Sequence, residues 1–322
     1  MPLTNIYNIM NTKHNNTIDF MRAVLIVLMI LIHIVNFGTL YPGIKDGILA
    51  FLMPSFLVIT GYLVNVDKPL CEFGTYLMRI ALPYVIMVTG FALLSLYLPV
   101  RGGIDHFDIP TLCHTLFVTS IGPYWFLHAM IVCGTLYYAT FRLTANTCIG
   151  IVSRLALLAT VMIVVSQHTP FLSLRNAAYY FIGVVIRVSL GNFDSVYRKS
   201  LLALVPFALL ISQRDLHDWG TLSVLACVMC FFCFCASIEQ LSPACLRHTM
   251  HYIGRNTLPI YIFHPIFTML AKYILPIFAF DPTGLTHAAV TIILCLVGSI
   301  CIGWFMDRTR LSYIFGKRNI IR

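Results

Sequence analysis

Residues 18–37 read IDFMRAVLIVLMILIHIVNF, a stretch long and apolar enough to cross a bilayer as one helix. Its start carries Asp19 and Arg22, and a single histidine, His33, lies deep in the apolar run. Arg22 and His33 are eleven residues apart, which is about 16 Å along a helix that rises ~1.5 Å per residue. Because ionisable side chains within a spanning helix are costly, we interpret both as functional.

Composition extends this interpretation to the whole chain. Of its 322 residues, 59% are hydrophobic and only 10% are charged, whereas soluble proteins have about a quarter of their residues charged. We therefore predict an all-α, polytopic integral membrane protein. About ten apolar segments approach the ~20 residues that a span requires, and the seventh of them is short: 18–38, 47–65, 76–98, 123–141, 149–167, 173–190, 199–212, 217–238, 256–278 and 285–306.

The basic residues predict the orientation in the membrane. If both termini are cytoplasmic, 16 lysines and arginines fall on the inner side and 5 on the outer side, as the positive-inside rule requires. The chain then divides into a flexible cytoplasmic arm (1–17), a ten-helix membrane domain (18–307) and a basic cytoplasmic tail (308–322) that sets topology or contacts anionic lipid. The formal net charge is +9, but there is no basic block outside the membrane that would bind nucleic acid.

Cations and imidazoles fall at different depths of the predicted bundle. Arg79 lies near the inner end of the third segment and Arg255 just before the ninth, so both join Arg22 on the inner side. Arginines bind phosphate groups through charge-assisted, often bidentate hydrogen bonds; for Arg79, the alternative is a side chain that extends to the lipid headgroups. Tyr261 and His264 share one face of the ninth segment, and His264 lies around mid-membrane.

The outer side offers four further candidates that would contact a substrate. They are Trp125, His128, Arg175 and Asn36. Trp125 also fits an aromatic belt at the membrane surface, and His128 is explained more simply as an unpaired core or interfacial histidine. Arg175 would orient a substrate hydroxyl or an anionic glycan, although an interfacial anchor explains it equally well.

The residue types favour one kind of chemistry. No P-loop, GxSxG, HExxH or dinucleotide fingerprint is present, and no carboxylate lies at mid-depth to drive a proton-coupled pump. The cysteines in CVMCFFCFC (227–235) lie in an apolar helix, so we expect no metal site. Inner cations would hold a phosphate-bearing donor, while a partly buried histidine takes the proton from a hydroxyl that arrives from outside. Acyl transfer from a nucleotide thioester is such a reaction.

Five motifs in order resemble the membrane acyltransferase 3 family, which includes O-acetyltransferases of bacterial surface polysaccharides and peptidoglycan and the fucose 4-O-acetylase-like proteins. The spacing from Arg22 to His33, preceded by Ile18-Asp19, looks like the opening signature of that family. Four later stretches are similar to its other helix motifs: MPSFLVITGYL (53–63), YLMRIALPY (76–84), PYWFL (123–127) and IGRNTLPIYIFHPIF (253–267).

The resemblance implies acetyl-CoA, or another acyl-CoA, as donor and a carbohydrate hydroxyl as acceptor. His33 would be the general base or the transient acyl acceptor, His264 and Tyr261 would polarise the thioester, and the CoA phosphates would bind Arg22, Arg79 and Arg255. Family members often have two basic residues in the third helix, whereas this chain has only Arg79, so the donor would also depend on Arg187 or on the other arginines.

These expectations place the protein in the inner (plasma) membrane of a bacterium, in contact with lipid, acyl-CoA and a glycan, as a monomer or a homo-oligomer. Two other functions remain open from the sequence. One is a transporter or flippase for a glycan or lipid-linked sugar. The other is a non-catalytic partner in a glycan-export complex.

Overall fold

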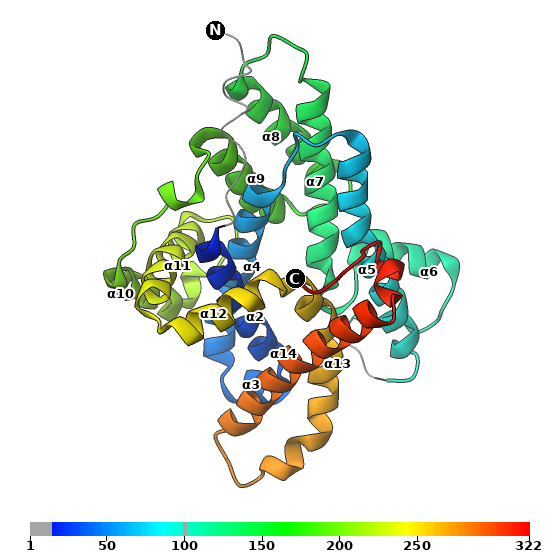
Figure 1. Cartoon of the computed structure of the whole chain (residues 1–322), viewed down its shortest axis with the longest axis vertical. Coiled ribbons are helices and arrows are strands. Elements are labelled where there is room, and N and C mark those ends of the chain that lie inside the picture. The colour runs from blue at the N-terminus through cyan, green and yellow to red at the C-terminus, as the bar shows by residue number, and fades with distance from the viewer. Residues whose placement is uncertain (1–14, 99–101) are drawn as a thin grey trace.

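The computed structural model describes residues 15–98 and 102–322, and these residues form helices with no strand among them (Figure 1). The predicted all-α class is therefore confirmed. Most of the predicted N-terminal arm lies outside the described residues. Eight helices within the described ranges are long and apolar enough to cross a membrane: α2 (Asn16–His33), α4 (Pro42–Leu63), α5 (Leu70–Ser95), α7 (Trp125–Leu143) with its preceding turn, α8 (Ile151–His168), α11 (Leu222–Leu241), α13 (Thr257–Ile274) with its following turn, and α14 (Leu285–Arg308).

The other two predicted spans are shorter helices. One is α9 (Leu174–Val185), which continues as a π-helix over Ile186–Leu190, and the other is α10 (Leu204–Ser212), which follows a 3-10 turn. The count of ten spans and the cytoplasmic position of both termini stay predictions. The polar helix α12 (Ala244–Arg255), between α11 and α13, was not predicted.

The first span does not continue as one helix to residue 38. The side chain of Asn15 accepts the N–H of Ile18 at 3.2 Å and caps the start of α2. The helix ends at His33 because Ile34 adopts an extended backbone, with φ −76° and ψ 107°, and the short α3 (Val35–Leu40) starts immediately afterwards. His33 therefore occupies the C-terminal end of α2 and not its interior.

Glycines allow the central helices to approach closely. A Cβ on Gly61 of α4 would overlap the carbonyl group of Tyr180 in α9, and a Cβ on Gly183 of α9 would overlap that of Val58. Gly254 of α12 has the same relation to the backbone of Asp19 in α2. Small residues at such crossings let the backbones of two helices pack closely. This packing stabilises helix association inside a bilayer, where the hydrophobic effect does not favour it.

The helices at the centre and the edge of the bundle differ in burial. In the most apolar window of α4, 83% of the residues are buried, compared with 11% in α8 and 22% in α14. The apolar side chains that α8 and α14 leave uncovered form a surface suited to contact with lipid. The centre is thus made by α2 and α4, on which the site described below is built.

A short helix lies in the connection that follows α5. Asp108 accepts the N–H of Thr111 at 2.6 Å and caps α6 (Ile109–His114). This hydrogen bond from the Thr111 backbone lowers the pKa of the Asp108 carboxyl. A π-helix follows over Thr115–Thr119, and the chain then turns into α7.

The C-terminal segment is folded against the bundle. A 3-10 helix (Leu311–Phe315) turns back beside α5, as Figure 1 shows in red and cyan. Phe315 is buried and lies parallel to Phe263 of α13, with the ring centroids 6.1 Å apart. The carboxylate of Asp307 accepts the N–H groups of Ile320 and Ile321 at 2.7 and 3.0 Å. The stretch predicted as a basic tail therefore folds back against α5 and α13.

Candidate active site

The two histidines singled out in the sequence meet in the structure. His33 ends α2, and His264 lies in the middle of α13. Their ring centroids are 5.3 Å apart, and the ring planes meet at 73°. Residues that are more than two hundred positions apart in the chain thus form one pair near the centre of the bundle.

Both rings are held by backbone carbonyl groups. Nδ1 of His33 lies 2.7 Å from the carbonyl oxygen of Met29, and Nδ1 of His264 lies 2.9 Å from that of Tyr261. A carbonyl oxygen only accepts, so Nδ1 is the protonated nitrogen in each neutral ring and Nε2 carries the lone pair. This is the tautomer in which Nε2 takes up a proton.

Only one of the two rings reaches open space. His33 is half-buried and lines a chamber of about 650 Å³. His264 is fully buried, does not belong to the chamber lining, and its Nε2 has no hydrogen-bond partner among the described residues. His33 is therefore placed to meet a substrate, and His264 packs against its ring from behind.

The chamber has the size and lining of a small-molecule site. It contains two more of the predicted residues, Tyr261 and Trp125, beside His33. The Trp125 ring lies 6.1 Å from that of Trp219, which was not predicted. Other lining groups come from several helices: Met29, Ile32, Lys45, Leu49, Met53, Phe91, Thr119, Ser120, Gly122, Pro123, Pro265, Thr268, Met269 and Lys272.

Two lysines give the chamber a positive character. Lys45 of α4 and Lys272 of α13 both line it, and no carboxylate belongs to its described lining. Both fall on the predicted outer side of the membrane and are two of the five cations counted there. Their separation in the chain, however, gave no sign that they share a wall with His33.

The turn before α7 holds a strained backbone at the chamber wall. Ser120 has φ 56° and ψ 172°, a region that is otherwise almost restricted to glycine. The next wall residues, Gly122 and Pro123, lead into Trp125, and the hydroxyl of Tyr261 donates to the Pro123 carbonyl oxygen. Such conformations cost about 1–3 kcal/mol and cluster at functional sites. The strain therefore supports the chamber as the place where this protein acts.

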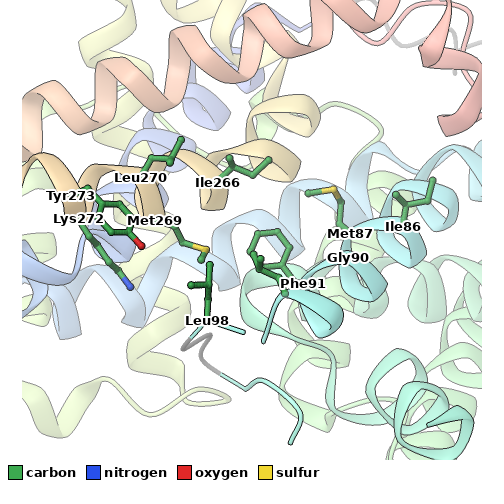
Figure 2. Close-up of a pocket in the computed structure, with 11 residues that line it drawn as sticks. Ile86, Met87, Gly90, Phe91, Leu98, Ile266, Met269, Leu270, Lys272 and Tyr273 are labelled. Carbon is green, nitrogen blue, oxygen red and sulfur yellow. The ribbon is translucent and has the colours of Figure 1, made fainter. Parts of the chain in front are cut away.

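An apolar groove adjoins the chamber. It has a volume of about 510 Å³ and lies between α5 and α13, with Lys272 at one end and Ile86 at the other (Figure 2). Phe91, Met269 and Lys272 line both the groove and the chamber. The groove thus leads from the histidine chamber along two helices.

The predicted inner cations gather at the opposite end of α2. Asp19 is buried, and its two carboxylate oxygens lie 3.5 Å from Arg22 and 3.5 Å from Arg255. Arg79 of α5 is exposed, and its Nε donates to the carbonyl oxygen of Gly316 at 3.3 Å. Helix α2 therefore carries an ion-paired cation cluster near its start and the chamber histidine at its end.

One sequence family matches this chain. The family model described as an acyltransferase domain matches residues 15–307, which is most of the chain and includes both ends of α2 and the whole of α13. The chain belongs to the membrane acyltransferase 3 family. No curated protein and no solved structure matches it. It is thus an acyltransferase with several membrane helices. A mechanism for this activity has to account for two features of α2: the cation cluster near its start and the histidine pair at its end.

Four other residues lie outside the chamber of this membrane acyltransferase. His128 stacks on Tyr84 with ring centroids 5.9 Å apart, Arg175 is exposed at the start of α9, and Asn36 packs against Gly284. Arg187, considered for donor binding, is buried and donates to the carbonyl oxygen of Tyr62 at 3.2 Å. Their roles in binding a substrate or the donor stay predictions.

Proposed function

We propose that this acyltransferase moves an acyl group, the acetyl group in the simplest case, from cytoplasmic acyl-CoA to a carbohydrate hydroxyl bound in the chamber. The observation that carries the proposal is the state of His33. Its Nδ1 is fixed to the Met29 carbonyl, its Nε2 carries the lone pair, and its ring lines the chamber. A general base needs a ring that is held in one tautomer and borders the space that the substrate enters.

The transfer uses one proton and one bond exchange. Nε2 of His33 takes the proton of the acceptor hydroxyl while that oxygen attacks the thioester carbonyl carbon. The C–S bond then breaks, and the CoA sulfur leaves and receives the proton from His33. The end of a helix carries partial negative charge, so the C-terminal position of His33 in α2 stabilises the positive charge that the ring gains between these steps.

Tyr261 and His264 take supporting roles in this scheme. The hydroxyl proton of Tyr261 is committed to the Pro123 carbonyl oxygen. Tyr261 therefore holds the strained turn beside Trp125 and does not itself polarise the thioester. His264, packed edge-on against His33 at 5.3 Å, fixes the orientation of that ring.

The donor binds from the other end of α2. CoA is too highly charged to cross the bilayer, so its phosphates stay with Arg22, Arg79 and Arg255, and its thioester arm extends along α2. The distance to cover is the length of α2 between Arg22 and His33, about 16 Å at ~1.5 Å per residue.

The groove between α5 and α13 supports an acceptor sugar that is carried on a lipid. Its lining is almost wholly apolar, which suits a lipid tail, and Lys272 stands where the groove joins the chamber. The ammonium group of Lys272 would meet the phosphate that links lipid and sugar, so that the sugar enters the chamber. Such acceptors belong to the inner membrane of bacteria.

Labelled acetyl-CoA tests this function. Membranes that contain the protein, supplied with labelled acetyl-CoA and lipid-linked glycan, should transfer label to the glycan, and the variant His33→Gln should abolish the transfer. His248→Gln, an exposed histidine on α12, serves as a matched control. Family membership already favours an enzyme over the transporter considered above. Transfer that persists undiminished in His33→Gln would refute the proposed base and revive the non-catalytic interpretation.

A further inference from the structure

The C-terminal segment brings extra cations to the inner cluster. Lys317 is half-buried, and the charged groups that act on it are Arg79 of α5, Asp307 of α14, and Arg322 of its own segment. Arg322 also acts on Arg22 of α2. Four cations from three parts of the chain therefore lie within electrostatic reach of one another.

This placement is built by specific hydrogen bonds. Asn256, fully buried between α12 and α13, accepts the backbone N–H of Arg322 at 2.8 Å and donates to its carbonyl oxygen at 3.0 Å. The hydroxyl of Ser312 donates to the carbonyl oxygen of Arg318 at 3.0 Å, and Arg79 donates to Gly316. With the Asp307 carboxylate on Ile320 and Ile321, the segment is fixed at both ends.

Among the described residues of this cluster, positive charge exceeds negative charge. Arg22 and Arg255 share the single carboxylate of Asp19, and both oxygens of Asp307 accept backbone N–H groups. Burial, with the nearby Arg322 and Arg79, lowers the pKa of Lys317 to about 8. Crowding like charges in this way costs stability, and a bound anion would offset that cost.

We propose that Lys317 and Arg322 form part of the binding site for the phosphates of the acyl-CoA donor. The inference rests on the proposed function, because that function supplies the polyanion. It also supplies a second cation where the third-helix motif has only one. That motif contains Arg79 alone, and Lys317, near the other end of the chain, is held close to Arg79. Ammonium and guanidinium groups both bind phosphate oxygens, the latter often in a bidentate manner.

Coenzyme A binding to the purified protein in uncharged detergent tests the proposal. Lys317→Gln and Arg322→Gln should each raise the Kd for coenzyme A and the KM for acetyl-CoA by about tenfold, the loss of one charge-assisted contact. The kcat should stay within about twofold. Lys317→Arg should restore binding. The matched control is Arg308→Gln, an exposed cation at the end of α14 that should leave both constants unchanged.

The outcomes separate this inference from the function on which it rests. If the wild-type protein binds no coenzyme A, the proposed function fails. If it binds coenzyme A and the Lys317→Gln, Arg322→Gln and Arg308→Gln proteins bind it equally well, the inference is overturned and the function stands. A third arm measures coenzyme A binding in vesicles with and without anionic lipid. If the Lys317 and Arg322 variants lose binding only in anionic vesicles, the segment is a lipid contact, and the proposal is equally overturned. Thermal unfolding of each variant identifies any loss that reflects misfolding.

Discussion

His33→Gln gives the sharpest test of the chamber chemistry. Glutamine is similar in length and keeps hydrogen-bonding capacity, but its amide takes up no proton at neutral pH. Loss of a general base costs about 10²–10⁴-fold in rate. The helix end adds to this, because about 0.3–1 kcal/mol of favourable interaction with positive charge is lost when no imidazolium forms at the end of α2. We therefore expect kcat to fall by at least about a hundredfold.

The KM for acetyl-CoA in His33→Gln should stay within about twofold of the wild-type value. In the proposed function the donor phosphates bind at the start of α2, and His33 lies eleven residues from Arg22 at the other end of that helix. Single-turnover transfer from labelled acetyl-CoA, with purified protein and saturating acceptor, measures the chemical step directly. A rate within threefold of wild type, or a loss that lies entirely in KM, would show that His33 is not the base.

Three more predictions address the groove, the cation cluster and the helix crossing. Gly90 has open space beside its Cα, so Gly90→Phe should fill the groove and slow transfer to a lipid-linked acceptor about tenfold without slowing transfer to a soluble sugar, whereas Gly74→Phe, at an equally open position of α5, should slow neither. The Kd of coenzyme A should rise above pH 8 as Lys317 loses its proton, and titration calorimetry from pH 7 upward should find no such rise in Lys317→Arg. Gly254→Ala forces α12 away from α2 and should lower the free energy of unfolding by about 1–3 kcal/mol, measured by denaturation in detergent.

Hydropathy was sufficient for the class of fold and for most of its spans. It did not predict that the helix breaks after His33, because the residues LIHIVNF (31–37) contain no proline or glycine that would indicate a break. The extended backbone at Ile34 arises where α2 meets α3 and α13. Tertiary contacts thus override a local pattern that favours a continuous helix, and the sequence alone placed the histidine inside a helix that in fact ends there.

The motifs were a better guide to which residues are candidates for the site than to how those residues are arranged in space. Arg22, Arg255, His33 and His264 were identified from residue type and spacing, and the structure joins them in two pairs. Lys45 and Lys272 were counted only as outer cations. Their place in one chamber wall depends on helices that are far apart in the chain, for which a single sequence carries no signal. The same reason hid the folded C-terminal segment, since Arg79 meets Gly316 across most of the chain.

The two clusters on α2 have separable consequences. One helix carries the cation cluster at its start and His33 at its end. If these are the donor site and the base, as proposed, a rigid α2 fixes the distance between the bound phosphates and the reacting hydroxyl. Changes at the cation cluster should therefore appear in KM, and changes at His33 in kcat, because neither alters the other end. Asp19 is the exception that tests this division. It pairs with both arginines and its backbone lies against Gly254, so its loss should release two cations and loosen the crossing that holds α2 in place. A change at Asp19 is thus expected to affect KM and stability together while the chemistry at His33 continues.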